Sequence, residues 1–148
     1  MRWMLFLLGT FKIPMIGYLR PRLMELTDAH VLVRIKCRRR SKNHLNSMYF
    51  GALAVGADIS AGIHAFYFAK KHNLKVSFAF KSMHVEFLKR AETDVTFSCE
   101  QGRLIEEIVL ESHQTHTRIN RQIDVRALNT AGELVATFVM EISVKVVD

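Results

Sequence analysis

Proline and glycine are scarce in this sequence, and neither gathers into a flexible stretch. Two prolines and seven glycines are spread over 148 residues, and no low-complexity tract, repeat or linker divides the chain. A chain of this length can bury a sizeable core, and 49% hydrophobic and 24% charged residues are ordinary for a globular protein. We therefore expect one domain that covers residues 1–148.

Cysteine and metal-ligand motifs are also rare. Cys37 and Cys99 each lie in a strand-like alternation and are expected to be buried free thiols, as in a cytoplasmic protein. His84, and the pair His113 and His116, have no further ligands at metal-binding spacing. The sequence therefore predicts neither a metal site nor a cofactor.

Acidic residues are in deficit. The chain has 21 Lys and Arg against 14 Asp and Glu, which gives a net charge of +7 and a pI near 9.7. This charge favours anionic partners, whether nucleic acid, acidic membranes or phosphate-bearing small molecules. The basic run Arg38–Lys42 lacks the interleaved aromatic residues of a nucleic-acid site, so no nucleic-acid partner is expected. Ser41, Ser47 and Ser60 lack the context of a nucleophile elbow.

The N-terminus has no hydrophobic run long enough for a bilayer. The run Trp3–Leu8 is too short, and Lys12, Pro14 and Arg20 interrupt the next apolar residues. No cleavage site for secretion is present after this run, so neither secretion nor stable membrane insertion is expected. Two interpretations stay open: an amphipathic helix that covers the core, or a helix that lies on a membrane surface.

Hydrophobic periodicity indicates the elements. Alternation predicts strands over residues 31–37, 75–80, 83–91 and 94–100, and a final hairpin of residues 121–128 and 133–146. Helical spacing predicts a helix over residues 103–112 and an apolar helix of about 23 residues, capped by Ser47 and ending near His72. A helix that is apolar on every side must be enclosed, and a wrapped antiparallel sheet supplies the enclosure. The expected fold class is α+β.

Asp58 is the one charged residue in the middle of that long helix. Between Met48 and Ala69 every other residue is apolar, small or weakly polar. Burial of an unpaired carboxylate costs folding free energy, so a structural or functional role must account for Asp58. One interpretation is a buried ion pair with Lys81 or Lys42. The other is contact with a ligand or catalysis, since burial raises the pKa of a carboxyl group and makes it a better general base at neutral pH.

Three stretches resemble an uncharacterised family of the hotdog-fold superfamily that is grouped with the thioesterases. They are RSKNHLNSMYFGALAVGAD, FKSMHVEFLKRAETDVTFSCE and NTAGELVATF. With the order of the elements, the resemblance covers nearly the whole chain from about Pro14 onward. It implies a curved antiparallel sheet wrapped around one long central helix, to which the N-terminal segment adds the short helix expected above.

The start of the helix is similar to the motif of the phenylacetyl-CoA type of hotdog thioesterase. Asn43 matches the motif's Asn, Gly51 matches the second glycine of its His-Gly-Gly triplet, and Asp58 matches its catalytic acid. Tyr49 stands in place of the His, Phe50 in place of the first glycine of the triplet, and Asn46 in place of an earlier glycine of the motif. The resemblance implies an acyl-thioester hydrolase that acts on acyl-CoA or acyl carrier protein, with Asp58 as general base or nucleophile.

The spacing between Asp58 and the helix start predicts an assembly. From Ser47 to Asp58 the helix rises by about 16 Å, so the two cannot act on one carbonyl within a single chain. Amides at a helix start suit an oxyanion, and Gly51 lets a carbonyl approach. We therefore expect a homo-oligomer, a dimer or tetramer, in which Gly51 of one subunit and Asp58 of another share a site.

Other residues are expected to bind substrate, at the motif or through the phosphates or acidic surface of the carrier. They are Tyr49, Phe50, Asn46, Lys81, Lys89 and Arg90. Purely structural alternatives stay open for these residues: Tyr49 as a core aromatic, Asn43 as a residue that shapes the loop, and the basic residues as solvated surface. A second function also stays open, a non-catalytic acyl-CoA or acyl-carrier binding or scaffold protein, because Tyr49 and Phe50 alter the catalytic motif.

Overall fold

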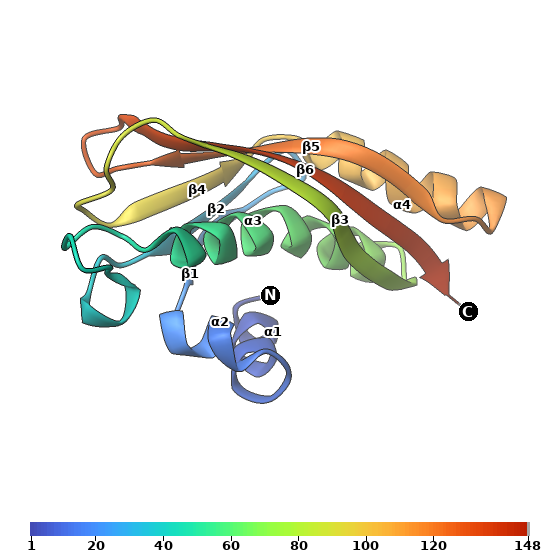
Figure 1. Ribbon diagram of the computed structural model, residues 1–148. Coiled ribbons are helices and arrows are strands. Elements are labelled where there is room, and N and C mark those ends of the chain that lie inside the picture. The colour runs from blue at the N-terminus through green and yellow to red at the C-terminus, as the bar shows by residue number, and fades with distance from the viewer. Residues whose placement is uncertain (148) are drawn as a thin grey trace.

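The computed structural model describes residues 1–147 and shows a curved six-stranded sheet around one long helix (Figure 1). The strands lie in the order β1-β2-β4-β5-β6-β3, and every neighbouring pair is antiparallel. Their bounds are β1 Arg22–Leu26, β2 Val31–Ile35, β3 Lys75–Phe87, β4 Val95–Cys99, β5 Ile119–Leu128 and β6 Leu134–Val147. The expected α+β class and the wrapped sheet of the hotdog fold are confirmed.

The long helix α3 (Phe50–Lys71) runs along the concave side of the sheet. Gly56 lies on its sheet-facing side, where a Cβ atom would fall 2.2 Å from the ring of Phe97. By length and composition α3 could cross a membrane, but 72% of its apolar window is buried inside the protein. It is therefore the core helix, whose apolar surface is enclosed by protein rather than lipid.

The helix begins later than the sequence predicts. Tyr49, not Ser47, is the N-cap of α3, and no side chain caps the helix. Ser47 instead belongs to a turn before the helix, where its hydroxyl and its amide both donate to the Oδ1 atom of Asn43. The predicted cap is wrong because Asn43 competes successfully for these groups. The C-terminal end agrees with the prediction, with His72 as the C-cap.

Strand β3 is one continuous strand, where the sequence predicts two. Its register shifts between Phe80 and Ser82, so Lys81 is an extra residue in a β-bulge. Before the bulge Val76, Phe78 and Phe80 are the half-buried positions, whereas beyond it Val85 is. A bulge reverses the alternation, which is why one strand has two hydrophobic phases.

Strand β1 is absent from the sequence prediction. Leu23 is its one buried residue, so no alternation marks it, and a register shift between Leu23 and Glu25 disturbs its pairing with β2. Cys37 is only partly buried because β2 ends at Ile35, whereas Cys99 in β4 is buried as expected. Both thiols are free.

Helix α4 (Gly102–Thr115) lies beside β5 and β6 and contacts the C-terminal part of α3 (Figure 1). Ile105, Ile108 and Val109 form its buried face. The sequence predicts this helix over residues 103–112, and its existence and its apolar face are confirmed.

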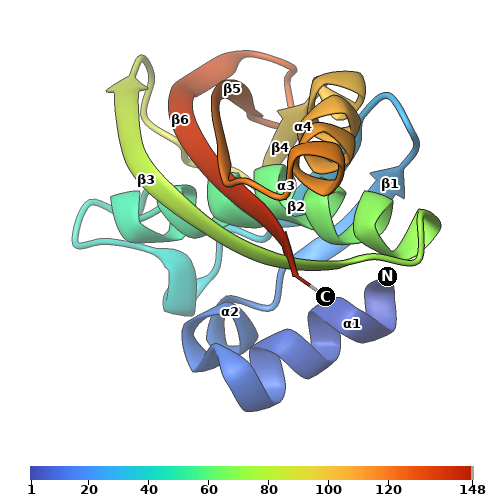
Figure 2. The same cartoon turned by 90° about the vertical axis from the view of Figure 1, so that its right-hand side faces the viewer.

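The N-terminal segment covers the side of α3 that the sheet leaves open (Figure 2). It is two short helices, α1 (Arg2–Leu7) and α2 (Pro14–Leu19), joined by the π-helical turn Leu8–Lys12, rather than one helix. Leu5 and Ile16 are buried in a second hydrophobic cluster with Ile59 and Ile63 of α3. The expected cover over the core is therefore present.

Candidate active site

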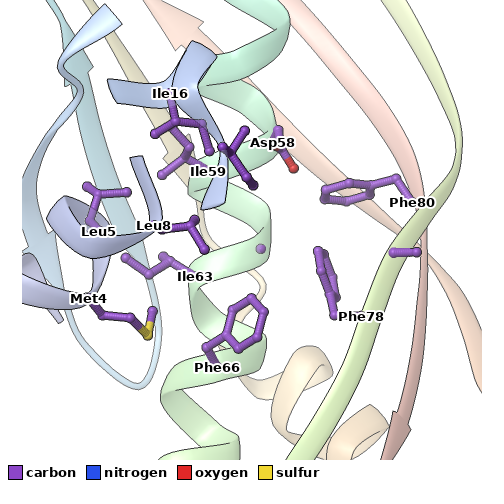
Figure 3. Close-up of a pocket in the computed structure, with 13 residues that line it drawn as sticks. Met4, Leu5, Leu8, Ile16, Asp58, Ile59, Ile63, Phe66, Phe78 and Phe80 are labelled. Atoms are coloured by element: carbon purple, nitrogen blue, oxygen red, sulfur yellow. The ribbon is translucent and has the colours of Figure 1, made fainter. Parts of the chain in front are cut away.

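A cavity of about 300 Å³ lies where α3, β3 and the N-terminal helices meet (Figure 3). The lining residues are Met4, Leu5, Leu8, Ile13, Ile16, Asp58, Ile59, Gly62, Ile63, Phe66, Phe78, Ala79 and Phe80. Asp58 is the only polar or ionisable side chain among them. An apolar cavity with one polar group is the usual form of a small-molecule site.

Asp58 is half-buried and has no hydrogen-bond or ion-pair partner among residues 1–147. Burial raises the pKa of its carboxyl group above the usual 3.8. Its carboxylate points toward Phe80 of β3 (Figure 3). The ion pair with Lys81 or Lys42 is not formed, and that interpretation is wrong.

The start of α3 offers free amide groups. The N–H groups of Ala52 and Leu53 both bond to the carbonyl of Tyr49, whereas those of Phe50 and Gly51 have no acceptor in the described part of the chain. The rings of Tyr49 and Phe50 are exposed and lie 4.6 Å apart between centroids. Unbonded amides at a helix start form a ready anion site, and here two exposed rings flank it.

These amides and Asp58 are separate within one chain. From Phe50 to Asp58 the helix rises by about 12 Å, still too far for both to contact one carbonyl. The later helix start therefore shortens the predicted separation without removing it. Gly51, Ala54, Val55 and Asp58 form one partly exposed stripe of α3, so Gly51 and Asp58 lie on the same side of the helix.

The loop before α3 is shaped by Asn43. Its Oδ1 atom accepts hydrogen bonds from the amides of Leu45 at 2.9 Å and Ser47 at 3.2 Å. Asn43 therefore shapes the loop, which is the structural alternative to a catalytic role for this residue. Asn46 has a φ of +59°, a conformation that Gly and Asn adopt most readily. This explains why Asn46 can stand where the resembling motif has a glycine.

The basic residues expected to bind substrate do not form one cluster around the cavity. Lys81 is exposed in the β3 bulge, one residue beyond Phe80 of the cavity wall. Lys89 is paired with Glu133, which leaves its ammonium group engaged on the surface. Arg90 is exposed and carries no ion pair among the residues described.

The sequence matches one protein family along nearly its whole length. Residues 2–144 match the family described as "Domain of unknown function (DUF4442)". The chain belongs to the DUF4442 family. No curated protein matches the sequence.

The fold of this DUF4442 protein recurs in solved structures. A candidate thioesterase from Shewanella oneidensis superimposes with a TM-score of 0.85 at 13% identity, over 97% of this chain and 96% of that chain. A protein of unknown function from Pseudomonas aeruginosa, also considered a candidate thioesterase, has a TM-score of 0.79 at 20% identity, with coverage of 98% and 95%. A mutant thioesterase from the same organism has a TM-score of 0.73 at 13% identity, with coverage of 99% and 95%. At these identities the likeness shows the hotdog fold.

Most of the cavity wall in the DUF4442 protein was missed by sequence reasoning. Phe78 and Phe80 carry a signal, since their alternation marks one face of β3, but nothing in it indicates a cavity. Met4 and Leu8 lie in the N-terminal segment, whose place over α3 depends on long-range packing. Only Asp58 stands out from sequence alone, because charge is rare in a core helix.

Proposed function

We propose that this DUF4442 protein hydrolyses acyl thioesters carried by coenzyme A or acyl carrier protein. The observation that carries the proposal is Asp58, an unpartnered carboxylate with a raised pKa in the wall of an otherwise apolar cavity. The cavity suits an acyl chain, because each CH₂ group removed from water contributes about 0.8 kcal/mol. An acyl chain in the cavity brings its thioester carbonyl to the carboxylate.

The chemistry needs a base or nucleophile and a group that holds the oxyanion. As a base, Asp58 takes a proton from water while the water oxygen attacks the acyl carbon; the thiolate leaves and is reprotonated, giving a carboxylic acid and a free thiol. As a nucleophile, Asp58 attacks the acyl carbon and the thiolate leaves and is protonated; water then cleaves the resulting anhydride, which releases the carboxylic acid and restores Asp58. The raised pKa of Asp58 suits both routes, because a more basic carboxylate is also a better nucleophile.

A second copy of the chain supplies the oxyanion donors in this proposal. Strand β3 pairs with β6 on one side only, and its 13 residues otherwise form an open sheet edge. Long open edges are usually covered, and pairing of two β3 edges in a dimer or tetramer would cover this one. The same strand carries Phe78 and Phe80 of the cavity wall, so the cavity borders the proposed interface. The amides of Phe50 and Gly51 then come from the partner.

Activity is tested first with matched carboxylate variants. We expect the parent to hydrolyse members of a panel of acyl-CoA substrates of increasing chain length, and Asp58→Asn to lower kcat/KM by at least about 100-fold. Asp124→Asn is the control, since Asp124 is an exposed carboxylate on β5. Equal rates for the parent and Asp58→Asn would remove Asp58 from the mechanism.

The shared site is tested by mixing two inactive variants. Asp58→Asn and Gly51→Val are purified separately, then unfolded and refolded together. If the site is shared, a hybrid dimer has one intact site, with Asp58 from one chain and Gly51 from the other, and activity returns. A mixture that stays inactive although hybrid dimers form would show that Asp58 and Gly51 do not share a site across two chains.

A non-catalytic acyl-binding function is the second candidate, and Tyr49 favours it. Its ring fills the space beside Gly51, where a Cβ atom would fall 2.6 Å from the ring, and so narrows the room for a substrate on that side. Calorimetry with a non-hydrolysable acyl-CoA thioether, beside turnover of the matching thioester, separates the two functions. Tight binding of the thioether without turnover of any chain length decides for the binding protein.

We further propose that the chain works as a single domain in the cytoplasm. Its elements share one sheet and one core helix, and both of its cysteines are free thiols. Imaging of the tagged full chain in its own host tests the location. Enrichment outside the cytoplasm would contradict it.

A further inference from the structure

The outer surface of helix α1 is apolar where a solvent-facing surface is normally polar. Leu5 points inward and is buried, whereas Trp3, Phe6 and Leu7 lie at i, i+3 and i+4 on the opposite face and are exposed. The side chain of Trp3 is 69% exposed and stacks on Phe6 with ring centroids 5.5 Å apart. The helix therefore presents a contiguous aromatic face to the outside.

Helix α2 and the turn before it extend this face. Met15 and Tyr18 lie at i and i+3 on α2 and are both exposed, Met15 at 65%. Ile13 is exposed between the helices. We call this set the N-terminal apolar surface; it consists of Trp3, Phe6, Leu7, Ile13, Met15 and Tyr18. Exposed apolar surface of this kind marks an interaction site.

An arginine-lined groove of about 1050 Å³ adjoins this surface. Its charged lining residues are Arg2, Arg20, Arg22 and Arg34, and no acidic residue lines it. Phe6 and Tyr18 line it as well, so groove and apolar surface are continuous. Arg22 and Arg34 are directly opposite in the β1–β2 register, an arrangement of like charges that an anion between them relieves.

The positive charge of the whole protein is concentrated at this end. Residues 1–42 contain ten Lys and Arg against two Asp and Glu, whereas residues 43–148 contain eleven against twelve. The two acidic residues are already paired, Glu25 with His30 at 3.1 Å and Asp28 with Lys71 at 2.7 Å. The excess charge therefore belongs to the N-terminal helices, to the two strands that come after them and, for half of the cations, to the stretch Lys36–Lys42 that follows β2.

The basic loop before α3 reaches the same place. Arg40 donates to the carbonyl of Tyr18 at 3.0 Å, and its guanidinium lies 5.5 Å from the centre of the Tyr18 ring. Its neighbour Arg39 is exposed. Cations far apart in sequence thus surround the outer face of α2.

We propose that this end of the molecule docks on an anionic phospholipid surface. Exposed Trp, Phe and Leu side chains beside a cluster of Arg are what an interfacial helix needs, because the apolar side chains enter the lipid while the arginines meet phosphate groups. A second copy of the chain fits poorly, since a two-fold contact would bring the same arginines together. Nucleic acid also fits poorly, because its bases and phosphates would make no favourable contact with the aliphatic side chains of Leu7, Ile13 and Met15.

The docking face is preformed. A Cβ atom on Gly17 would lie 2.3 Å from the carbonyl oxygen of Gly9, so the π-helical turn packs directly against α2. The inner sides of the helices are held by Ile59 and Ile63. Binding therefore needs little ordering of the chain, which preserves affinity.

Docking in this orientation places the cavity near the lipid. Met4, Leu5 and Leu8 line the cavity, while Trp3, Phe6 and Leu7 of the same segment face outward. The cavity thus lies within about 10 Å of the docked surface, the diameter of one helix. The docking proposal does not depend on the proposed hydrolase activity, because vesicle binding needs no substrate.

The experiment is vesicle flotation of the full chain. We expect binding to vesicles of phosphatidylcholine mixed with phosphatidylserine, little binding to pure phosphatidylcholine, and loss of binding as salt screens the charges. Arg20→Gln with Arg22→Gln should lower the partition coefficient by about 20-fold, and Trp3→Ser with Phe6→Ser by at least about tenfold.

Matched controls remove the same kinds of group elsewhere. Arg103→Gln with Arg126→Gln removes two exposed cations, and Leu45→Ser with Leu88→Ser removes two exposed apolar side chains. Both should bind vesicles as the parent does, and circular dichroism should show every variant folded.

Several results would overturn the proposal. They are absence of parent binding, equal binding to both vesicle types, and controls as weak as the test variants. A fall in oligomeric mass for Trp3→Ser with Phe6→Ser, without any change in vesicle binding, would assign the surface to a second copy. Salt-sensitive binding of RNA in place of vesicles would also refute it.

Discussion

The ring of Tyr49 covers Gly51 at the start of α3: a Cβ atom on Gly51 would fall 2.6 Å from Cε1 of that ring. The contact is made by an exposed side chain, which lies where a side chain at position 51 would otherwise stand. Tyr49 is 48% exposed, so the interpretation of this residue as a core aromatic is wrong. Its ring packs against Gly51, and its hydroxyl has no hydrogen-bond partner among residues 1–147.

Tyr49→Phe should therefore keep kcat/KM within about twofold of the parent. Gly51→Ala should lower kcat/KM about tenfold, because the methyl group displaces the ring and narrows the approach to the amide, with little change in Tm. Steady-state kinetics and thermal unfolding of both variants provide the comparison. If Tyr49→Phe is as slow as Gly51→Ala, the hydroxyl has a role of its own.

Asp58→Asn should stabilise the protein at neutral pH. Burial raises the folded-state pKa of Asp58 above 3.8, so the contribution of this group to stability is present in acid and is lost as the pH rises through that raised pKa. Removing the charge should add about 1 kcal/mol to the free energy of unfolding at pH 7, and the gain should vanish below about pH 4. Urea unfolding at both pH values measures it. Asp124→Asn should show no such gain, and an equal effect of both variants would contradict the assignment to burial.

His64 should make the protein less stable in mild acid. Its side chain is fully buried, with Nε2 2.9 Å from the carbonyl oxygen of Thr27. Burial lowers the pKa of His64 below 6.5, and the nearby His30 lowers it as well. The hydrogen bond with Thr27 and the charge of Asp28 raise the pKa, but they do not outweigh burial. Stability from the neutral ring is therefore complete above pH 6.5 and falls as the pH drops below it.

The test for His64 is chemical unfolding between pH 7 and about pH 5. His64→Phe should flatten the decline in unfolding free energy over this range, since it removes the titrating ring. His84→Gln, at an exposed position, should leave the decline unchanged. A decline as steep in His64→Phe as in the parent would assign it to other groups.

Gly17→Ala should destabilise the N-terminal cover. The added methyl group meets the carbonyl of Gly9, a backbone atom that cannot move aside cheaply. We expect a loss of about 2 kcal/mol in the free energy of unfolding. Thr10→Ala, at an exposed position in the same segment, should stay within about 0.5 kcal/mol of the parent. Equal losses for both would show that the Gly9–Gly17 contact is not tight in solution.

The core architecture could be predicted because α3 is apolar on all sides, which requires a wrapped sheet. The misplaced boundaries have local causes: Asn43 captures Ser47 before the helix, and Lys81 reverses the alternation of β3. Strand β1 was missed because Leu23 alone is buried. Local patterns thus identify long elements and fail where one side chain or one bulge decides the outcome.

The candidate site was predictable in its carboxylate and not in its cavity. Asp58 stands out because charge in a core helix has a high cost. The cavity is formed when Leu8 of the N-terminal segment and Phe80 of β3 both lie next to Asp58. The hydrophobic periodicity of these two segments does not predict that they come together there. Asn43 and Lys89 are engaged in a turn and a surface ion pair, contacts that depend on neighbours the motif does not include.

Asp58 also affects the protein before it folds. In a newly synthesised chain, before the sheet encloses it, α3 is 22 residues long and apolar enough to span a bilayer. An aspartate near the middle of such a segment costs about 3 kcal/mol when the translocon tests it for insertion. Asp58 therefore disfavours insertion of the nascent helix into a membrane before the β-strands have packed around α3.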